Sequence, residues 1–421
     1  MTALDVSTAT EQPEGCGPML QNALTPARSQ RQQVFEYVRA AGAVSRIDVA
    51  KSLGVSPGTV TSIVSELMDA GLLVETDTAP RDTTRGRPPV ALAVAPKARY
   101  VVGIKLSDRI HTAVLTDFAG NLVADATLDT QPHRRPAAQA IAETGGLLDR
   151  LLAKTDLDRS AISAMALGLP GIVDYETGHV AWSPLIAEED CALAGLLSAR
   201  FPFPVRIDND ANLLTMAELW FGAGRARSDF AVITVEEGLG MGLVLENQLF
   251  RGSNGHGLEL GHTKVQIDGA LCRCGRRGCL EAYVADYALA REAVTVIDGD
   301  ATIDGGSGPA LEALYEAAKA GYGPAQTIFQ RAGRYLAAGI ANVIQLFDPK
   351  LILLSGARMR FDYLYADEVL AEARAMTRHA GRAEVDIEIH TWGDLVWARG
   401  AAALALQILT DETLGKTRTA S

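Results

Sequence analysis

Hydrophobic and polar residues alternate with two different periods along most of the chain after Pro96. Short apolar runs, which predict strands, occupy 100–104, 111–115, 164–169, 205–207, 230–235, 241–245 and 351–354. Longer segments with helical spacing lie between them, at 137–153, 211–221 and 324–347. Strands that alternate with helices in this way predict layers of α/β structure, in which the first two strands pair with each other.

The segment 28–95 has another pattern, in which three helices precede a polar hairpin. Ser45 is a suitable N-cap for a helix that ends near Leu53, and Gly54 suits the tight turn that follows it. Ser56 is the next N-cap, with a proline directly after it. The helix that begins there has an apolar stripe at helical spacing, made of Val60, Ile63, Val64, Leu67 and Met68.

The opposite face of this last helix is small and polar, which suits entry into a major groove. A short strand at 72–74 and a returning strand at 90–94 enclose a basic wing, and arginines of such a wing can enter a narrow minor groove. The candidate DNA-binding residues are Ser56, Thr59, Thr61, Ser62, Ser65, Arg85 and Arg87. The pattern predicts a winged helix-turn-helix that binds operator DNA; the alternative is a helical interaction module with a charged loop.

Charge and composition divide the chain into three parts. Residues 1–27 carry three acidic and no basic side chains, lack periodicity and predict a disordered tail. Residues 28–95, the predicted DNA-binding domain, carry eight Lys and Arg against seven Asp and Glu, whereas the whole chain of 421 residues has a net charge of -12. Residues 96–421 are therefore acidic, and DNA contact is expected only near the N-terminus.

No signal peptide is evident near Met1, and no apolar stretch approaches the roughly 20 residues that span a bilayer. These features predict a cytoplasmic protein with no membrane contact. In a reducing compartment, five cysteines are better suited to metal binding or burial than to disulfides.

Three cysteines fall within eight residues, and a histidine lies ten residues upstream. One structural Zn²⁺ per chain is expected to bind His262, Cys272, Cys274 and Cys279. Neighbouring arginines, Arg273 among them, would help to keep the thiols deprotonated. Three buried or oxidised thiols are the alternative, whereas Cys16 and Cys191 are isolated and have no predicted role.

Four further motifs follow one another along the chain: Gly168-Leu-Pro-Gly171, Asn209-Asp210-Ala-Asn212, Glu259-Leu-Gly-His262 and Cys272-x-Cys274-Gly-x-x-Gly-Cys279-x-Glu281. In their order and spacing they resemble the ROK family of repressors, uncharacterised reading frames and sugar kinases. The resemblance runs from about residue 28 to about residue 408. It implies two α/β lobes of the actin-like (ribonuclease H-like, sugar-kinase) fold around a sugar pocket. The implied sugar-binding residues are Gly171, Asn209, Asp210, Glu259, His262 and Glu281.

The chemistry of these residues fits a sugar, because carboxylates and amides can each bond vicinal hydroxyls. In kinases of the family Asp210 would be the general base, and glycine-rich loops would bind ATP. Here the first such loop reads Lys105-Leu-Ser-Asp-Arg109 and the second reads Glu236-Glu237-Gly238, so phosphate-binding glycines are missing and carboxylates are added. The sequence therefore predicts a sugar-binding domain that is not an enzyme.

The leading hypothesis is a transcriptional regulator, most simply a repressor, whose DNA affinity depends on a sugar. An active sugar kinase with an appended DNA-binding domain is the second hypothesis, and a DNA-binding scaffold controlled by a protein partner is the third. A homodimer or homotetramer is expected, because one winged helix buries too little surface for tight specific binding. Sugar would act on the DNA-binding domain through the linker at 94–98.

Overall fold

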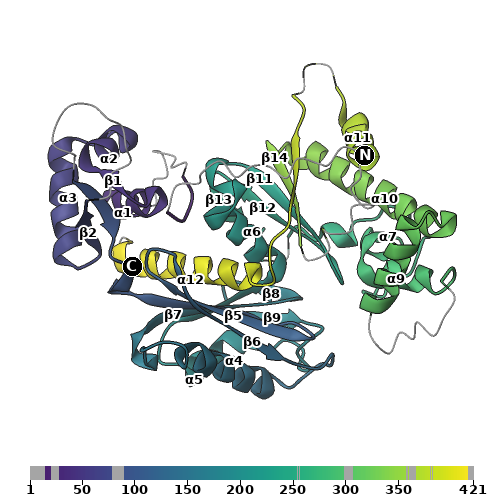
Figure 1. Cartoon of the computed structure of the whole chain (residues 1–421), viewed down its shortest axis with the longest axis horizontal. Coiled ribbons are helices and arrows are strands. Elements are labelled where there is room, and N and C mark those ends of the chain that lie inside the picture. Colours follow the sequence, from purple (N-terminus) through teal and green to yellow (C-terminus); the bar gives the residue numbers. More distant parts are fainter. Residues whose placement is uncertain are drawn as a thin grey trace.

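The computed structural model describes residues 15–19, 28–77, 90–253, 255, 257–297, 307–356, 359, 367–379, 381 and 383–415. Along these residues lie an N-terminal helical domain and two α/β lobes, each built on a five-stranded sheet (Figure 1). We call the N-terminal domain the reader, the lobe that contains β4 the first lobe, and the lobe that contains β11 the second lobe.

The reader contains three helices and a small sheet with the strand order β1-β3-β2. Its elements are α1 (Gln30–Ala41), β1 (Val44–Ser45), α2 (Arg46–Leu53), α3 (Pro57–Asp69), β2 (Leu73–Thr76) and β3 (Ala91–Val94). The caps predicted from the sequence are present, since Ser45 Oγ accepts from Asp48 N and Ser56 Oγ accepts from Thr59 N. Gly54 has the left-handed conformation expected after α2. Four residues of the predicted α3 stripe are buried, and Met68 is partly buried beside them.

The first lobe has the strand order β10-β7-β4-β5-β6, in which β4 pairs antiparallel with β5 and parallel with β7. Its strands are β4 (Tyr100–Lys105), β5 (Ile110–Asp117), β6 (Leu122–Asp129), β7 (Ile162–Leu169) and β10 (Val205–Asn209), and a hairpin adds β8 (Ile172–Asp174) and β9 (His179–Trp182). Its helices are α4 (Ala137–Leu152) and α5 (Leu193–Arg200), with short 3-10 turns η1 (Pro96–Ala98) and η2 (Arg159–Ala161). The predicted pairing of the first two strands is thus confirmed.

The second lobe has the strand order β13-β12-β11-β14-β15. Its strands are β11 (Phe230–Val235), β12 (Leu239–Leu245), β13 (Gln248–Phe250), β14 (Leu351–Ser355) and β15 (Asp386–His390). Its helices are α7 (Glu281–Val284), α8 (Asp286–Ala293), α9 (Ser307–Lys319), α10 (Gly323–Phe347) and α11 (Asp367–Thr377), with the turn η4 (Leu260–His262). These helices cover the sheet face that points away from the first lobe, in one buried apolar cluster.

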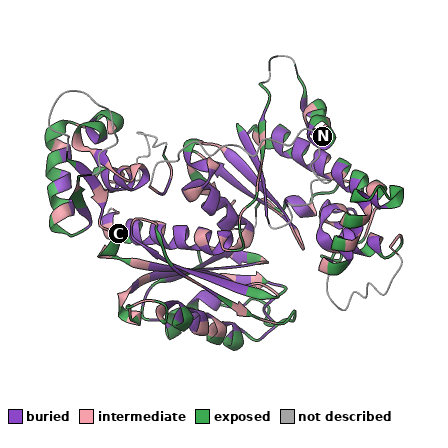
Figure 2. Cartoon of the chain, viewed as in Figure 1, coloured by how far each residue is buried: buried purple, intermediate pink, exposed green. Residues whose placement is uncertain are grey.

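Two buried helices fill the space between the lobes. Helix α6 (Asp210–Phe221) packs against the sheet of the second lobe, and α12 (Val396–Leu414) packs against that of the first lobe. Both are largely buried (Figure 2). They also pack directly on each other, because a Cβ atom at Gly400 would lie only 1.8 Å from the Leu213 carbonyl oxygen. Any larger residue at this crossing would separate the helices and hence the lobes.

The reader is docked on the rest of the chain through an apolar contact with a polar border. The rings of Phe35 in α1 and Phe118, which follows β5, lie 5.1 Å apart between centroids. Residues 15–19, which the sequence assigned to the disordered tail, instead lie in this interface, where Cys16 is buried. Hydrophobic periodicity does not reveal this contact, because it depends on how a Gly-Cys-Gly segment fits against α1 in the folded protein.

Among the described residues, no helix combines the length and the apolar character needed to cross a membrane.

Candidate functional sites

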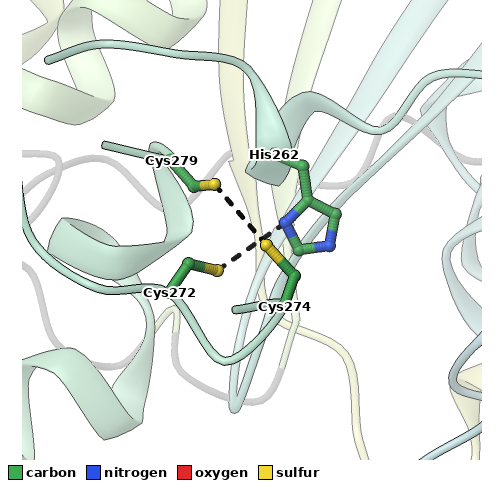
Figure 3. Close-up of side chains that lie close together, drawn as sticks. All are labelled: His262, Cys272, Cys274 and Cys279. Carbon is green, nitrogen blue, oxygen red and sulfur yellow. Dashed lines mark hydrogen bonds between the residues drawn. The ribbon is translucent and has the colours of Figure 1, made fainter. Parts of the chain in front are cut away.

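The candidate metal ligands predicted from the sequence come together in the second lobe. Turn η4 supplies His262, and the loop before α7 supplies Cys272, Cys274 and Cys279 (Figure 3). The ligand atoms all lie within 4.8 Å of one another. One imidazole and three thiols around one point match the tetrahedral Cys3His set of structural zinc sites, so the cluster could hold a metal ion.

A lysine, and not the arginines, is the cation at this cluster. Lys264 Nζ lies 2.9 Å from Cys279 Sγ. Arg273, which we expected to support the thiols, instead forms an ion pair with Glu237 at 3.2 Å and lies over the Tyr287 ring. The expectation failed because the long arginine side chain reaches outward to a carboxylate of the neighbouring turn.

Burial raises the pKa of the Cys272 thiol, and the hydrogen bond from Tyr287 opposes that change. A low-dielectric site disfavours a bare thiolate, so a cation at the cluster is the natural partner for it. Cys272 and Cys279 are buried, His262 is partly buried and Cys274 is exposed, so the cluster lies near the protein surface with two of its four ligand residues in the interior.

Asn209 and Asp210 stand where β10 ends and α6 begins. Asn209 is the N-cap of α6, since its Oδ1 accepts from Ala211 N at 2.8 Å, while its Nδ2 donates to the Gly171 carbonyl oxygen at 2.8 Å. Gly171 has a φ of 133°, and a Cβ there would lie 2.3 Å from the Trp182 carbonyl oxygen. Only glycine therefore allows the β7–β8 turn to approach Asn209 and fix its amide.

Burial raises the pKa of Asp210, whereas Lys105 lowers it and Glu236 raises it further. Lys105 lies at the end of β4, with its Nζ 3.7 Å from Glu236 Oε2 and 3.5 Å from the centre of the Trp397 ring. An acid, a lysine and a second acid thus meet at the N-terminal end of α6.

The remaining predicted sugar ligands lie beside the metal cluster. Glu281, the first residue of α7, accepts from Leu239 N at 3.3 Å through Oε2 and from the Tyr287 hydroxyl at 3.3 Å through Oε1. Its Oε1 is also 3.4 Å from Cys272 Sγ. Glu259 is exposed, with its Oε2 3.9 Å from His262 Nε2. The metal cluster and Glu281 therefore share direct contacts.

The β11–β12 turn at 236–239 joins these two groups. Its first residue, Glu236, faces Lys105 and Asp210, and its last residue, Leu239, donates to Glu281. Gly356, after β14, also approaches Glu236. Three segments that are far apart in the sequence thus converge here, on carboxylates and a lysine.

Sequence reasoning missed the residues that support this site from behind. Asp208 is fully buried, and its Oδ2 accepts from Arg251 Nε at 2.9 Å and lies 2.7 Å from Arg251 Nη2. The Arg251 guanidinium stacks on the Tyr175 ring at 3.9 Å. Asp208 directly precedes the Asn-Asp motif, which is a local signal, but its partner Arg251 follows β13, far along the chain, and gives none.

The predicted DNA-binding face of α3 is mostly exposed, at Thr61, Ser62 and Ser65, and Thr59 is partly exposed. Two of its hydroxyl groups form hydrogen bonds with the helix backbone. Ser56 Oγ accepts from Thr59 N, and Thr61 Oγ1 donates to the Pro57 carbonyl oxygen at 2.8 Å. Arg85 and Arg87 of the predicted wing lie outside the described residues.

Comparison with known proteins agrees with a DNA-binding domain that is followed by two α/β lobes. The model of the ROK family matches residues 102–408, and a model for winged helix-turn-helix DNA-binding domains matches residues 29–74. The xylose repressor of Caldicellulosiruptor bescii is 25% identical over 371 residues, which cover 86% of this chain and 92% of the repressor. A ROK family transcriptional regulator, a homologue of the E. coli MLC protein, has a TM-score of 0.75 at 27% identity, covering 91% of this chain and 96% of that protein.

A kinase is also similar to this chain. The ROK family glucokinase from Streptomyces griseus, solved with glucose and AMPPNP, has a TM-score of 0.61 at 27% identity and covers 73% of this chain and 99% of the kinase. The regulator therefore covers a larger share of this chain than the kinase does. Since the family match spans most of its length, the chain belongs to the ROK family, with a winged helix-turn-helix domain in front of the ROK domain.

Proposed function

We propose that this protein is a transcriptional regulator, acting as a repressor, whose affinity for operator DNA is set by a sugar. The observation that carries the proposal is the contrast within one site. The acids and amide suited to sugar hydroxyls, Asn209, Asp210 and Glu281, are held by hydrogen bonds at the ends of their helices. The phosphate-binding loops that the resemblance implies have Lys105 in place of an acid and Glu236 in place of a glycine. A regulator of this kind acts on the chromosome, in the cytoplasm.

The same contrast supports a sugar-binding domain without kinase activity. A phosphate group at the β11–β12 turn would meet the carboxylate of Glu236, and like charges about 4 Å apart repel by about 4 kcal/mol at an effective dielectric of 20. Lys105 offsets part of this charge but is already within 3.7 Å of that carboxylate. Transfer of a phosphoryl group depends on positioning and charge neutralisation, and this turn offers neither.

The test is a thermal-shift screen of wild-type protein with D-xylose, D-glucose and N-acetyl-D-glucosamine, each with and without Mg-ATP. We expect at least one sugar to raise the midpoint, since a ligand that binds only the folded state stabilises it. Mg-ATP should add nothing, and a coupled assay should detect no ADP. A wild-type protein that responds to none of these sugars would contradict the proposal.

An active kinase with an appended reader is the second candidate, favoured by the shared fold of the S. griseus glucokinase. It predicts sugar-dependent release of ADP, with loss of that activity in Asp210→Asn. ADP release that survives in Asp210→Asn would point to a contaminating enzyme, and sustained release that Asp210→Asn abolishes would replace our proposal.

We further propose one structural Zn²⁺ per chain at His262 and the three clustered cysteines. Four donor residues whose ligand atoms lie within 4.8 Å of one another support zinc with no open coordination position. Zinc would orient Glu281 through the loop that carries Cys272, and it would supply no chemistry to a reaction.

We propose that the protein binds its operator as a homodimer or homotetramer. Specific DNA-binding interfaces of high affinity usually combine two reading modules about one helical turn of DNA apart, and one α3 helix offers a single module. Light scattering of the purified protein at micromolar concentration should give twice or four times the chain mass. A monomer, free and on DNA, would contradict this expectation.

Replacing Arg87 with alanine should weaken DNA binding most at sites with A/T-rich flanks. A wing arginine responds to the narrow minor groove of A-tracts more than to base identity. The measurement is a titration of paired duplexes that differ only in their flanks, and Lys51→Ala on α2 is the control for a general loss of charge. Equal weakening on both duplexes would reduce Arg87 to a phosphate contact.

A further inference from the structure

The C-terminal end of α1 in the reader contacts both lobes. Arg39, which is buried, donates through Nη1 to the Thr410 hydroxyl of α12 at 2.8 Å. Its guanidinium also lies 4.5 Å from the centre of the Trp220 ring, near the end of α6. The last turn of α1 thus contacts α12, which covers the sheet of the first lobe, and α6, which covers the sheet of the second lobe.

A buried arginine then ties the reader to the entry of the second lobe. Arg225 lies in η3 (Ala223–Ala226), which leads directly into β11. Its Nη2 donates to the Ala40 carbonyl oxygen at 2.6 Å, and its Nε donates to the Gly17 carbonyl oxygen at 3.0 Å. Arg225 is 3% exposed, so these hydrogen bonds compete little with water.

The segment Gly15–Met19 completes this contact. Cys16 N donates to the Arg39 carbonyl oxygen at 3.1 Å, and Gly17 N donates to the Trp220 carbonyl oxygen at 2.9 Å. Met19 N donates to the Arg225 carbonyl oxygen at 2.8 Å. The segment therefore joins the reader, the end of α6 and η3 through backbone bonds that do not depend on side-chain identity.

The linker at 94–98 forms hydrogen bonds with the N-terminal domain and with the first lobe. Phe118 N, from the first lobe, donates to the Pro96 carbonyl oxygen at 3.0 Å, and Ala95 N donates to the Leu72 carbonyl oxygen of the reader at 2.9 Å. The linker at 94–98 is thus fixed between the reader and the first lobe. This linker stays a predicted route for the signal, and the contacts of Arg39, Arg225 and Gly15–Met19 provide a second route, which also reaches the second lobe.

Helix α6 connects the sugar ligands to this contact. It begins with Asn209 and Asp210 and ends beside Trp220, about 18 Å away for 12 residues at 1.5 Å each. Because α6 packs on the second sheet and touches α12 at Gly400, it cannot shift without changing the position of the second lobe relative to the first. A change at its first turn therefore reaches its last turn as a movement of the whole helix.

The interface also leaves room for such a movement. A hollow lies between α1 and the β12–β13 turn of the second lobe, with both polar and apolar residues in its lining. Its polar residues include Gln33, Glu36, Asn247 and Gln248. The aromatic contact of Phe35 with Phe118 joins the reader to the first lobe, so a small rotation of the second lobe at this hollow does not have to separate those rings.

We propose that Arg225 couples the two sites: sugar binding at the start of α6 moves the second lobe, and Arg225 transmits this movement to Ala40 and Gly17 and so turns the reader. The inference rests on the proposed sugar response and adds its route. Arg225 is a positioning residue, since it touches neither the sugar ligands nor the DNA-binding face of α3. Breaking its two bonds should leave both binding sites intact and uncouple them.

The test compares wild type, Arg225→Ala and Arg225→Lys by calorimetric titration of D-xylose, D-glucose and N-acetyl-D-glucosamine. Each protein is titrated free and bound to a duplex that wild type selects from a random pool. The ratio of the two affinities is the coupling factor, which is about 5 to 150 for typical allosteric proteins. We expect a factor above five for wild type, below two for Arg225→Ala, and an intermediate value for Arg225→Lys, which keeps the charge but replaces the planar guanidinium donors with a single ammonium group.

Arg291→Ala is the matched control, because Arg291 of α8 also donates to a backbone carbonyl, that of Ala282, at 3.1 Å but lies away from the reader. Hydrogen exchange of residues 30–41 gives a second readout that needs no DNA: sugar should alter it in wild type and not in Arg225→Ala. If Arg225→Ala keeps the coupling and exchange response of wild type, the inference is overturned while the proposed function stands. If wild type binds none of the sugars, the proposed function fails and the inference with it.

Discussion

Replacing Cys279 with serine should destabilise the second lobe by more than about 4 kcal/mol, a range reached when a protein loses a metal or a comparable constraint. Cys279 is fully buried, and its Sγ lies 3.7 Å from Cys274 Sγ within the ligand cluster. Structural zinc contributes its binding free energy to folding, about 10–16 kcal/mol in small zinc-binding peptides. Metal analysis should find one zinc per wild-type chain and much less in the variant, with a lower thermal midpoint and faster proteolysis.

Cys191→Ser is the matched control for this substitution. Cys191 is also a buried cysteine, 7% exposed, but it lies in the first lobe outside the cluster. It should keep its zinc and lose far less stability. Equal losses of stability in the two variants would show that the cluster is an ordinary set of buried thiols. The same conclusion would follow if the wild-type protein were equally stable without zinc.

Asp210→Ala should weaken sugar binding by about 10- to 150-fold, because a hydrogen bond to a charged group contributes about 1.5–3 kcal/mol. Operator binding without sugar should stay within about twofold of wild type, since Asp210 lies in α6 and not in the reader. The measurements are sugar titration by calorimetry and DNA titration by fluorescence anisotropy.

Two further variants separate the effect of the lost charge from any effect on folding. Asp210→Asn keeps the side-chain oxygen near Ala211 N, which is 3.0 Å from Asp210 Oδ1, and should lose sugar affinity without losing stability. Asp125→Ala, at an exposed acid of the first lobe paired with Lys154, should behave as wild type. An unchanged sugar midpoint in Asp210→Ala would remove Asp210 from the sugar site.

The pH dependence of sugar affinity should reveal the same carboxyl group. Burial raises the pKa of Asp210 above the ordinary value of 3.8, so it takes up a proton at a higher pH than an exposed aspartate does. The ionised form is the better acceptor for sugar hydroxyls, and affinity should therefore fall as the pH decreases through that raised pKa. Calorimetry in a series of buffers checks this, and Asp210→Asn should show a flatter profile.

Local signals were sufficient for much of this structure. The two serine caps, the glycine turn and the stripe from Val60 to Leu67 act within one or two helical turns, so sequence spacing predicts them. The metal cluster was predictable for the same reason, because its ligands lie in one loop and the turn before it. The second lobe's strand order follows from the family resemblance and not from any local pattern.

Contacts between distant segments were not predictable in this way. Lys105 contacts Glu236 and Trp397, and both of these residues lie more than one hundred positions away from it in the sequence. The burial of Cys16 likewise depends on Arg39 and Trp220, and the segment around it has no periodicity of its own. Such pairs depend on tertiary structure, which hydrophobic periodicity does not predict.

The position of α12 has a consequence for how the protein is made. This helix comes after every other element of the described chain, yet it covers the first sheet and supports α1, where the Ser29 hydroxyl donates to the Leu414 carbonyl oxygen at 2.9 Å. Domains generally fold during synthesis from the N-terminus onward. Here the first lobe exposes an apolar face until α12 has been synthesised. A chain that stops before Val396 should therefore be cleared by proteases, so incomplete synthesis yields no DNA-binding fragment that ignores its signal.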